Sequence, residues 1–474
     1  MLFTSPYYLF LFLPVTVTVY FLINRVASKS ASTLWLVMAS LFFYGYWSVN
    51  YLALIIISMV CNFSIGKSLY RTKQAGRQSL NRKLMLLLGL LFNVGLLAYY
   101  KYSDFIIANV NHVFETNTPL LNVLLPLAIS FFTFQQIAYL VDCYKASTQE
   151  YNLLNYGLFV TFFPQLIAGP IVHHKEMMPQ FNNIKNSRFN IGNVSKGVYI
   201  FAIGLFKKVA IADTFAIWAN EGYDQITRTA GNSLSILDAW QTSLSYTFQL
   251  YYDFSAYSDM AIGAALMFNI VLPINFNSPY KALNIQEFWH RWHITLSRWL
   301  RDYVYIPLGG SYKGATATYI NLMLTFIIGG LWHGAAWTFI VWGLLHGCAI
   351  VIHRVWQNRG ASLPIFVAWP VTFMFINITW VVFRAENMEI AINVIQSMVG
   401  LNGVNLVYAQ TTPIPLIVMV LCAYIAFRAK NTMEIAMSKQ AYCIKDGAWV
   451  GVTLFLSIVL GINSTSAEFL YFNF

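Results

Sequence analysis

The chain has 474 residues, of which 58% are hydrophobic and only 10% are charged, with a formal net charge of +11. Soluble domains typically carry about 25% charged residues, so this composition excludes a soluble globular protein and indicates a polytopic membrane protein. Its apolar runs are long and do not alternate with polar residues, which predicts an all-α bundle rather than a β-barrel. The excess of basic residues fits the positive-inside rule and gives no reason to expect a nucleic-acid partner.

The first apolar run, at residues 7–23, has no Lys or Arg before it and no evident cleavage site, so we expect a retained first span that Pro14 kinks. The loop at 66–83 contains basic residues and no acid, which predicts a cytoplasmic loop and a periplasmic N-terminus. The apolar runs together predict ten to twelve crossings within a single integral-membrane domain, residues 1–474.

Two polar interruptions follow in the middle of the chain. In "FFPQLIAGPIVHH", Pro164 and Gly169 are expected to break a helix, and His173 and His174 are expected at a solvated interface. In "YYDFSAYSDMAIG", Asp253 lies inside an apolar region, where aspartates commonly pair with a basic side chain. Asp253 is therefore either a buried clamp between helices, with Lys207 and Lys208 as possible partners, or part of a proton or hydroxyl relay.

Residues 281–313 form an amphipathic segment that is rich in both charge and tryptophan. Projected at 100° per residue, 284–302 predicts one helix with a Trp and Leu face, and with Arg291 and Ser297 on the polar face. His293 falls near the boundary between the two faces. The segment is predicted to lie in the membrane interface or to re-enter the membrane, where His293 either bonds to a carbonyl or headgroup or serves a functional site.

The stretch "IIGGLWHGAAWTF" places one ionisable side chain, His333, inside an apolar span. Such groups tend to face a cavity, a partner or a pathway, because their burial in lipid is costly. Glycines 329, 330 and 334 remove side-chain bulk, which permits either close helix packing or passage of a substrate. His333 is accordingly either a packed histidine or a functional one.

No metal site is expected, because the histidines lack accompanying acidic or cysteine ligands and the five cysteines are scattered. The chain has no phosphate-binding loop of the Walker type and no G-x-S-x-G nucleophile motif. These absences argue against an ATP-driven pump and a serine hydrolase.

The stretches "FWHRWHITLSRWLRDYVYIPLGG" and "GGLWHGAAWTFIVWGLLHG" resemble the membrane-bound O-acyltransferases. The match is to the bacterial branch typified by the alginate O-acetyltransferase membrane subunit, and "FFPQLIAGPI", "WVVFRAE" and the closing "FLYFNF" fit the same branch. The resemblance implies a multi-helix bundle around a central funnel or tunnel, with re-entrant segments. It also implies transfer of an acetyl group from a cytoplasmic thioester, acetyl-CoA, to a hydroxyl on the far side of the bacterial inner membrane.

The resemblance carries the catalytic histidines of the family onto His333 and His293. We place Trp332, Arg291, Ser297 and Asp253 among the substrate-binding residues. A neutral imidazole at His333 would act as general base toward the acceptor hydroxyl. The acceptor is expected to be an exported polysaccharide such as alginate, with peptidoglycan or another envelope polymer as the alternative. A periplasmic SGNH-hydrolase-like protein is the expected partner.

Two other functions are compatible with the same residues. In a transporter or channel, His333 and Asp253 would form a proton path across the bilayer. In a purely structural membrane subunit, the chain would only recruit the periplasmic acetylating protein.

Overall fold

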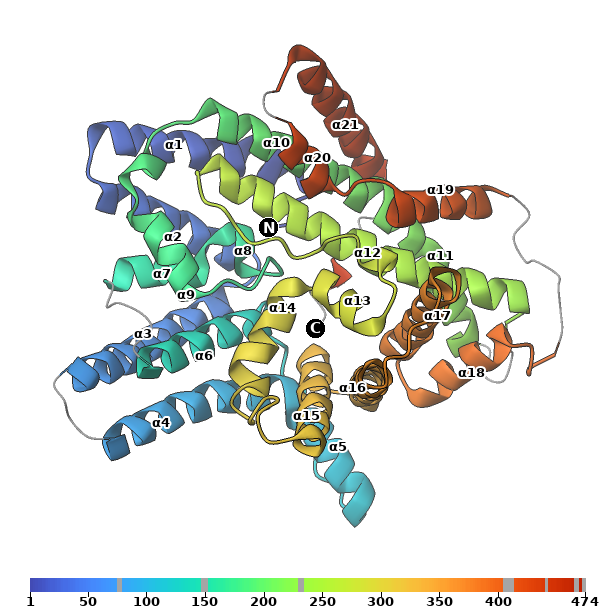
Figure 1. The fold of residues 1–474 in the computed structure, drawn as a ribbon. Helices are drawn as coiled ribbons and strands as arrows, with labels where there is room; N and C mark the ends of the chain where they lie inside the picture. The colour runs from blue at the N-terminus through green and yellow to red at the C-terminus, as the bar shows by residue number, and fades with distance from the viewer. Residues whose placement is uncertain are drawn as a thin grey trace. The chain divides into compact units, whose positions relative to one another are not determined.

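The computed structural model describes residues 1–74, 79–145, 152–228, 234–403, 413–439, 442–463 and 469–470. All regular secondary structure in these ranges is helical, which confirms the predicted all-α class (Figure 1). The predicted cytoplasmic loop is short: α3 ends at Gln74 and α4 begins at Ser79, so the connection itself, 75–78, lies outside the described residues.

The described residues form two compact units. The first comprises 1–202, 258–273 and 440–451, and the second comprises 203–257, 274–439 and 452–474. Whether the chain is a single domain stays a prediction. The first unit contains the following helices: α1 (Leu13–Val26), α2 (Lys29–Gly45), α3 (Val49–Gln74), α4 (Ser79–Leu97), α5 (Ser103–Phe114), α6 (Ile129–Lys145), α7 (Leu153–Thr161), α8 (Phe163–Leu166), α9 (His174–Asn182) and most of α10 (Ile191–Phe206).

The second unit holds Asp253, the amphipathic segment 281–313 and His333. Its helices are α11 (Asp213–Arg228), α13 (Ile285–Arg291), α14 (Ile294–Leu300), α15 (Ala315–His333), α16 (Trp337–Asn358), α17 (Ile365–Arg384), α18 (Met388–Met398), α19 (Ile414–Arg428) and α20 (Thr432–Ser438). Helices α12 (Ile236–Met267) and α21 (Ile444–Asn463) each contribute residues to both units.

Seven helices among the described residues are long and apolar enough to cross a membrane, or eight if the bent pair α19 and α20 is one span. These numbers are below the ten to twelve crossings predicted from apolar runs. Two of the apolar runs that were each expected to cross the membrane, residues 236–252 and 256–272, fall largely on one continuous helix, α12. The run near 154–172 is divided into the short helices α7 and α8, and its side chains are almost all buried. The predicted number of crossings therefore includes at least one apolar run, 154–172, whose side chains are buried within the protein.

The polar residues after α8 correct a further prediction. His173 and His174, expected at a solvated interface, are only 2% and 1% exposed. The His174 ring packs on the rings of Tyr139 and Phe159, with ring centroids 5.1 and 5.3 Å apart. Burial lowers the pKa of His174 to about 4, so its imidazole is neutral. The polarity of the sequence predicts that these two side chains are exposed to solvent, whereas both are buried in the protein.

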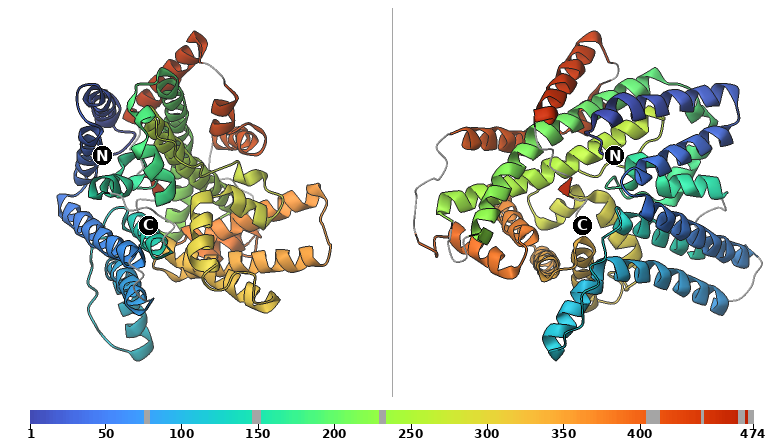
Figure 2. Two further views of the ribbon diagram at one scale, coloured as in Figure 1. Left: turned by 60° about the vertical axis from the view of Figure 1, so that its left-hand side comes forward. Right: turned by 180° about the vertical axis from the view of Figure 1, so that it is seen from behind.

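Glycine contacts hold α15 and α16 together as a helical hairpin (Figures 1 and 2). A Cβ atom on Gly330 would lie 2.2 Å from the Phe339 carbonyl oxygen, and one on Gly343 would lie 2.4 Å from the Phe326 carbonyl oxygen. A Cβ atom on Gly334 would meet the Phe339 ring at 2.0 Å. Of the two uses proposed for the glycine-rich stretch, the structure realises close helix packing.

Candidate active site

His333 is the last residue of α15 and lies at the closed end of the hairpin. Its side chain is buried among aromatic rings: the ring centroids of Trp332, Trp342 and Phe383 lie 4.9, 5.2 and 5.2 Å away. All three contacts are edge-on, so the imidazole is held from several directions. An imidazole fixed in this way keeps one orientation, which a catalytic base requires.

The amphipathic segment is not the single helix that its periodicity predicts. α13 ends at Arg291, His293 takes a left-handed backbone conformation with φ of 42°, and α14 begins at Ile294. The segment around Asn275 causes the break. The Ile294 N–H donates to the Asn275 carbonyl oxygen at 3.0 Å, and the Asn277 N–H donates to the Arg291 carbonyl oxygen at 2.9 Å.

This break changes the environment of His293 completely. The helical projection placed the side chain near an interface, but it is 0% exposed and packs edge-on against Phe254, with ring centroids 4.8 Å apart. Of the two alternatives for His293, contact with a headgroup at an interface does not fit this burial, and a functional role stays a prediction. Non-glycine residues seldom adopt positive φ, and they do so at functional sites where the surroundings hold them there.

Asn275 determines which nitrogen of His293 carries the proton. The Asn275 Oδ1 atom accepts from the Thr295 N–H at 3.3 Å and from the Thr295 hydroxyl at 2.8 Å, and it lies 3.1 Å from His293 Nδ1. A backbone N–H can only donate, so the amide atom at this position is the oxygen. His293 Nδ1 must therefore be the donor, and Nε2 carries the lone pair. Burial lowers the pKa of His293 to about 3, which keeps this tautomer neutral.

Trp332 joins the two histidines of the site. Its ring contacts His333 at 4.9 Å and His293 at 6.1 Å between centroids. The structure thus brings together three of the predicted site residues, which are His293, Trp332 and His333. His293 lies 40 positions before His333 in the chain. An apolar ring beside two imidazoles excludes water from the space that they share, which strengthens polar interactions there.

His346 lies behind this group as a structural support. The Trp289 indole N–H donates to His346 Nδ1 at 3.3 Å, so Nε2 carries the proton and donates to the Thr379 hydroxyl at 3.1 Å. Its ring also packs on Trp342 at 4.7 Å, and Trp342 contacts His333. His346 therefore fixes the aromatic wall.

A hollow of about 450 Å³ adjoins this wall. Its lining is apolar along α15 but carries four basic side chains, and it includes Trp289, which packs on Trp342 with ring centroids 5.8 Å apart. The basic lining residues are His290, Arg298, Arg301 and Arg354, and the predicted Ser297 lies among them. Such a hollow suits an anionic molecule that also has an apolar or uncharged part. In the described part of the chain, no three His, Cys, Asp or Glu side chains are grouped so as to hold a metal ion.

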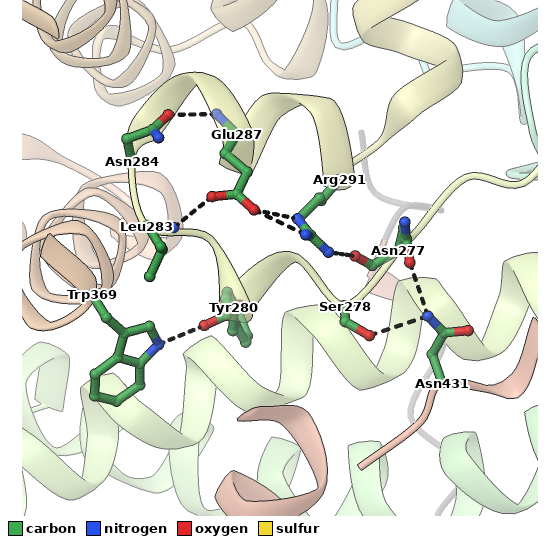
Figure 3. A network of polar contacts seen from close by, with 9 residues as sticks. All are labelled: Asn277, Ser278, Tyr280, Leu283, Asn284, Glu287, Arg291, Trp369 and Asn431. Carbon is green, nitrogen blue, oxygen red and sulfur yellow. Dashed lines mark hydrogen bonds and ion pairs between the residues drawn. The ribbon is translucent and has the colours of Figure 1, made fainter. Parts of the chain in front are cut away.

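Arg291 is not among the residues that line the hollow and belongs to a different network (Figure 3). Its guanidinium pairs with Glu287 at 2.9 Å and donates to the Asn277 carbonyl oxygen at 3.1 Å. Glu287 also accepts from the Leu283 N–H at 2.8 Å. Arg291 thus supports the fold of the segment that carries His293. Its predicted role in substrate binding stays a prediction.

Asp253 forms a buried ion pair, and its predicted place among the substrate-binding residues stays a prediction. Its carboxylate receives the Lys208 ammonium at 2.7 Å and the Leu470 N–H at 3.0 Å, and Lys208 also pairs with Asp213 at 2.7 Å. All three charged side chains are buried. This is the buried clamp considered above, and it holds the segment at 469–470 as well. The next residue, Phe254, is the one that contacts His293.

Sequence reasoning missed several residues that build this site. Asn275 lies in an unremarkable stretch, "PINFN", and only its position 18 residues before His293 in a non-helical region hinted at a turn. Arg354 lies at the far end of α16, and only the folded hairpin brings it to the hollow. Trp342 has an apolar neighbourhood that predicts simple packing. No local pattern identifies contacts of this kind.

Comparison with known proteins assigns the family. The model of the membrane-bound O-acyltransferase family matches residues 41–392. The chain is 46% identical to the peptidoglycan O-acetyltransferase of Helicobacter pylori, over 100% of this chain and 98% of that protein. It is 37% identical to the probable alginate O-acetylase AlgI of Pseudomonas putida, over 100% of both chains. It is also 27% identical to the teichoic acid D-alanyltransferase of Streptococcus thermophilus, over 50% of this chain and 59% of that protein. The chain therefore belongs to the membrane-bound O-acyltransferase family, in its alginate O-acetylase branch.

Proposed function

We propose that this multi-pass membrane O-acyltransferase takes acetyl from acetyl-CoA in the cytoplasm and passes it across the bacterial inner membrane to a polysaccharide of the cell envelope. The observation that carries the proposal is the placement of His333 and His293 against Trp332, beside a hollow lined by basic residues. The basic loop at 66–83 supports a cytoplasmic position for that loop and a periplasmic N-terminus.

In the proposed reaction His333 is the general base. The acceptor hydroxyl oxygen attacks the thioester carbonyl carbon while its proton passes to the His333 imidazole. The new ester C–O bond forms, the C–S bond breaks, and the leaving thiolate takes up the proton. The Nε2 lone pair of His293 is proposed to accept a hydrogen bond from a second hydroxyl of the acceptor and so to orient the attacking one, because Asn275 holds the proton of the His293 ring on Nδ1.

The donor is proposed to bind in the basic hollow. Thr325 lines the hollow and lies eight residues before His333 on α15, which is about 12 Å along the helix axis. Arginines are suited to phosphate groups, which coenzyme A carries at one end, and a long arm separates these phosphates from the thioester. The distance between the hollow and His333 thus suits a donor whose phosphates bind in the hollow while its acyl group extends to His333.

Arg354→Gln should raise the KM for acetyl-CoA roughly tenfold, with a smaller change in kcat, because a charge-assisted bond to phosphate contributes about 1.5–3 kcal/mol. The measurement is release of coenzyme A by purified protein in proteoliposomes over a range of acetyl-CoA concentrations. The control is Arg359→Gln, since Arg359 follows the same helix but is exposed and outside the hollow. Equal KM values for the two variants would exclude this hollow as the donor site.

Asn275→Asp should move the acidic limb of the pH–rate profile upward by about one to three units. The carboxylate keeps an acceptor for His293 Nδ1–H and adds a negative charge. It therefore raises the pKa of His293, so the neutral ring is lost at a higher pH as the pH falls. Thr295→Val is the control, because it removes one donor to the same oxygen without adding charge. An unchanged acidic limb in Asn275→Asp would show that the Asn275 contact does not set the state of His293.

The acceptor is proposed to be peptidoglycan first and alginate or another exported polysaccharide second. The peptidoglycan O-acetyltransferase and the alginate O-acetylase of the comparisons both match the whole chain, and the former has the higher identity. An SGNH-hydrolase-like protein in the periplasm is proposed to complete the transfer to sugar. Mass analysis of acetylated muropeptides and exopolysaccharide from a deletion strain tests the acceptor. Loss of acetyl from exopolysaccharide alone would overturn the peptidoglycan assignment.

A further inference from the structure

Two hollows in the second unit share part of their walls, and none of the residues that line them lines the basic hollow described above. One is an apolar hollow of about 430 Å³ between α12, α17 and α19, lined by residues that include Phe248, Phe373 and Met419. The other has a volume of about 740 Å³ and is lined by residues that include Lys281 and Arg428. Trp369 and Phe427 line both hollows, so the two form one groove with an apolar end and a basic end.

The basic end carries no compensating acid in its lining. Lys281 and Arg428 are the charged residues among those that line it. The nearest acid on the same segment, Glu287, is already paired with Arg291 and accepts from the Leu283 N–H (Figure 3). Glu434, on α20, is used to cap its own helix through the Asn431 N–H. Among the residues that line this hollow, Lys281 and Arg428 thus present positive charge that no acidic side chain of the lining offsets.

The groove is also held in shape by contacts that do not depend on an occupant. The Trp369 indole N–H donates to the Tyr280 carbonyl oxygen at 2.9 Å, which fixes the ring at the junction of the two hollows (Figure 3). Lys281 uses one of its three N–H donors on the Ala429 carbonyl oxygen at 2.6 Å. Asn431 donates to Asn277 and Ser278, and so ties α20 to the segment before α13.

We infer that this groove binds an anionic phospholipid of the bilayer, with its phosphate between Lys281 and Arg428 and one acyl chain along Trp369 and Phe427 in the apolar hollow. Basic pockets between transmembrane helices on the cytoplasmic side are suited to anionic headgroups. Further basic residues lie near the start of α17 and the end of α19. Arg354 and Arg359 come shortly before α17, and Lys430 comes just after α19, as is typical of the cytoplasmic ends of membrane helices. The site is separate from the acyl-transfer site and does not depend on the proposed reaction.

The test is native mass spectrometry of the purified full chain released from detergent that contains equal amounts of phosphatidylglycerol and phosphatidylethanolamine. The wild-type chain should retain phosphatidylglycerol in preference. Lys281→Gln and Arg428→Gln should each weaken that retention roughly fivefold, in line with the free energy of one cation near an anionic surface. Lys430→Gln removes a neighbouring charge outside the groove and should leave retention unchanged.

Two further variants keep the test independent of folding. Lys281→Arg retains the charge and should restore preferential retention, and Ala423→Trp fills the apolar hollow and should reduce retention of phosphatidylglycerol while Lys281 and Arg428 remain. Equal retention of the two lipids by the wild-type chain would overturn the inference. So would a Lys281→Gln and Arg428→Gln double variant that keeps phosphatidylglycerol as well as the Lys430→Gln control does.

Discussion

His333→Ala should lower acetyl transfer about 10²–10⁴-fold while the protein still accumulates in the membrane. The substitution removes the proposed general base but leaves Trp332, Trp342 and Phe383 to fill the aromatic enclosure. The measurement is acetyl ester on the exported polymer, together with turnover of labelled acetyl-CoA in membranes. His112→Ala serves as the matched control, because His112 is an exposed histidine near the end of α5.

The same variant separates the rival functions. Unchanged acetyl ester with a lost ion or substrate flux would support a transporter in which His333 conducts protons. Acetylation that stays intact in an assembled complex would indicate a structural subunit that only recruits the periplasmic enzyme. Loss of both ester and acetyl-CoA turnover, with normal accumulation of the protein, is the result that the acyltransferase proposal requires.

Lys208→Met should destabilise the protein by about 3–5 kcal/mol, because it leaves two carboxylates buried without their cation. Lys208 contacts both Asp213 and Asp253 at 2.7 Å, and its ammonium also lies 4.5 Å from the centre of the Phe469 ring. Its removal should therefore also release the 469–470 segment. Thermal unfolding in detergent and proteolytic sensitivity of that segment are the two measurements.

Lys207→Met provides a close comparison for this prediction. Lys207 precedes Lys208 and donates to the Ser255 hydroxyl at 3.0 Å, and it is less buried than Lys208. Its loss should therefore cost much less than the loss of Lys208. Adding Asp213→Asn and Asp253→Asn to Lys208→Met should recover part of the stability, since it removes the unpaired charges. Equal melting temperatures for Lys207→Met and Lys208→Met would contradict the assignment of a buried clamp.

The features predictable from sequence were those set by composition and by local spacing. The low charge and long apolar runs predict membrane helices, and the structure is all-α in its described ranges. The isolated position of His333 predicts a residue with a special environment, and the structure buries it among aromatic rings. Both inferences depend on the free-energy cost of exposing polar groups to lipid. That cost can be judged for each residue from its own type and its neighbours in the sequence.

The features that could not be predicted depend on distant segments. The periodicity of 284–302 favours one helix, but the backbone of Asn275 and Asn277 bonds to the Ile294 N–H and the Arg291 carbonyl oxygen, which a continuous helix would pair within itself. The helical projection thus assigned His293 to the wrong environment. The clamp between Asp253 and Lys208 was among the predicted alternatives, but the second carboxylate in it, Asp213, follows from how α12 meets the residues after α10. Each outcome was decided by tertiary contacts that override local preference.

The length of α15 has a consequence for the kind of donor that the enzyme can use. The helix has 19 residues and begins just after Lys313, so His333 lies about 28 Å from that basic end, close to the roughly 30 Å thickness of the hydrocarbon layer. In the proposed complex the phosphates of the donor lie in the basic hollow beside Thr325, so about 12 Å of this helix would separate them from His333. A compact donor such as acetyl phosphate would have to bring its own charge down that distance. An acyl group on a flexible, uncharged tether would cover it, so the proposed site would favour donors by reach as well as by chemistry.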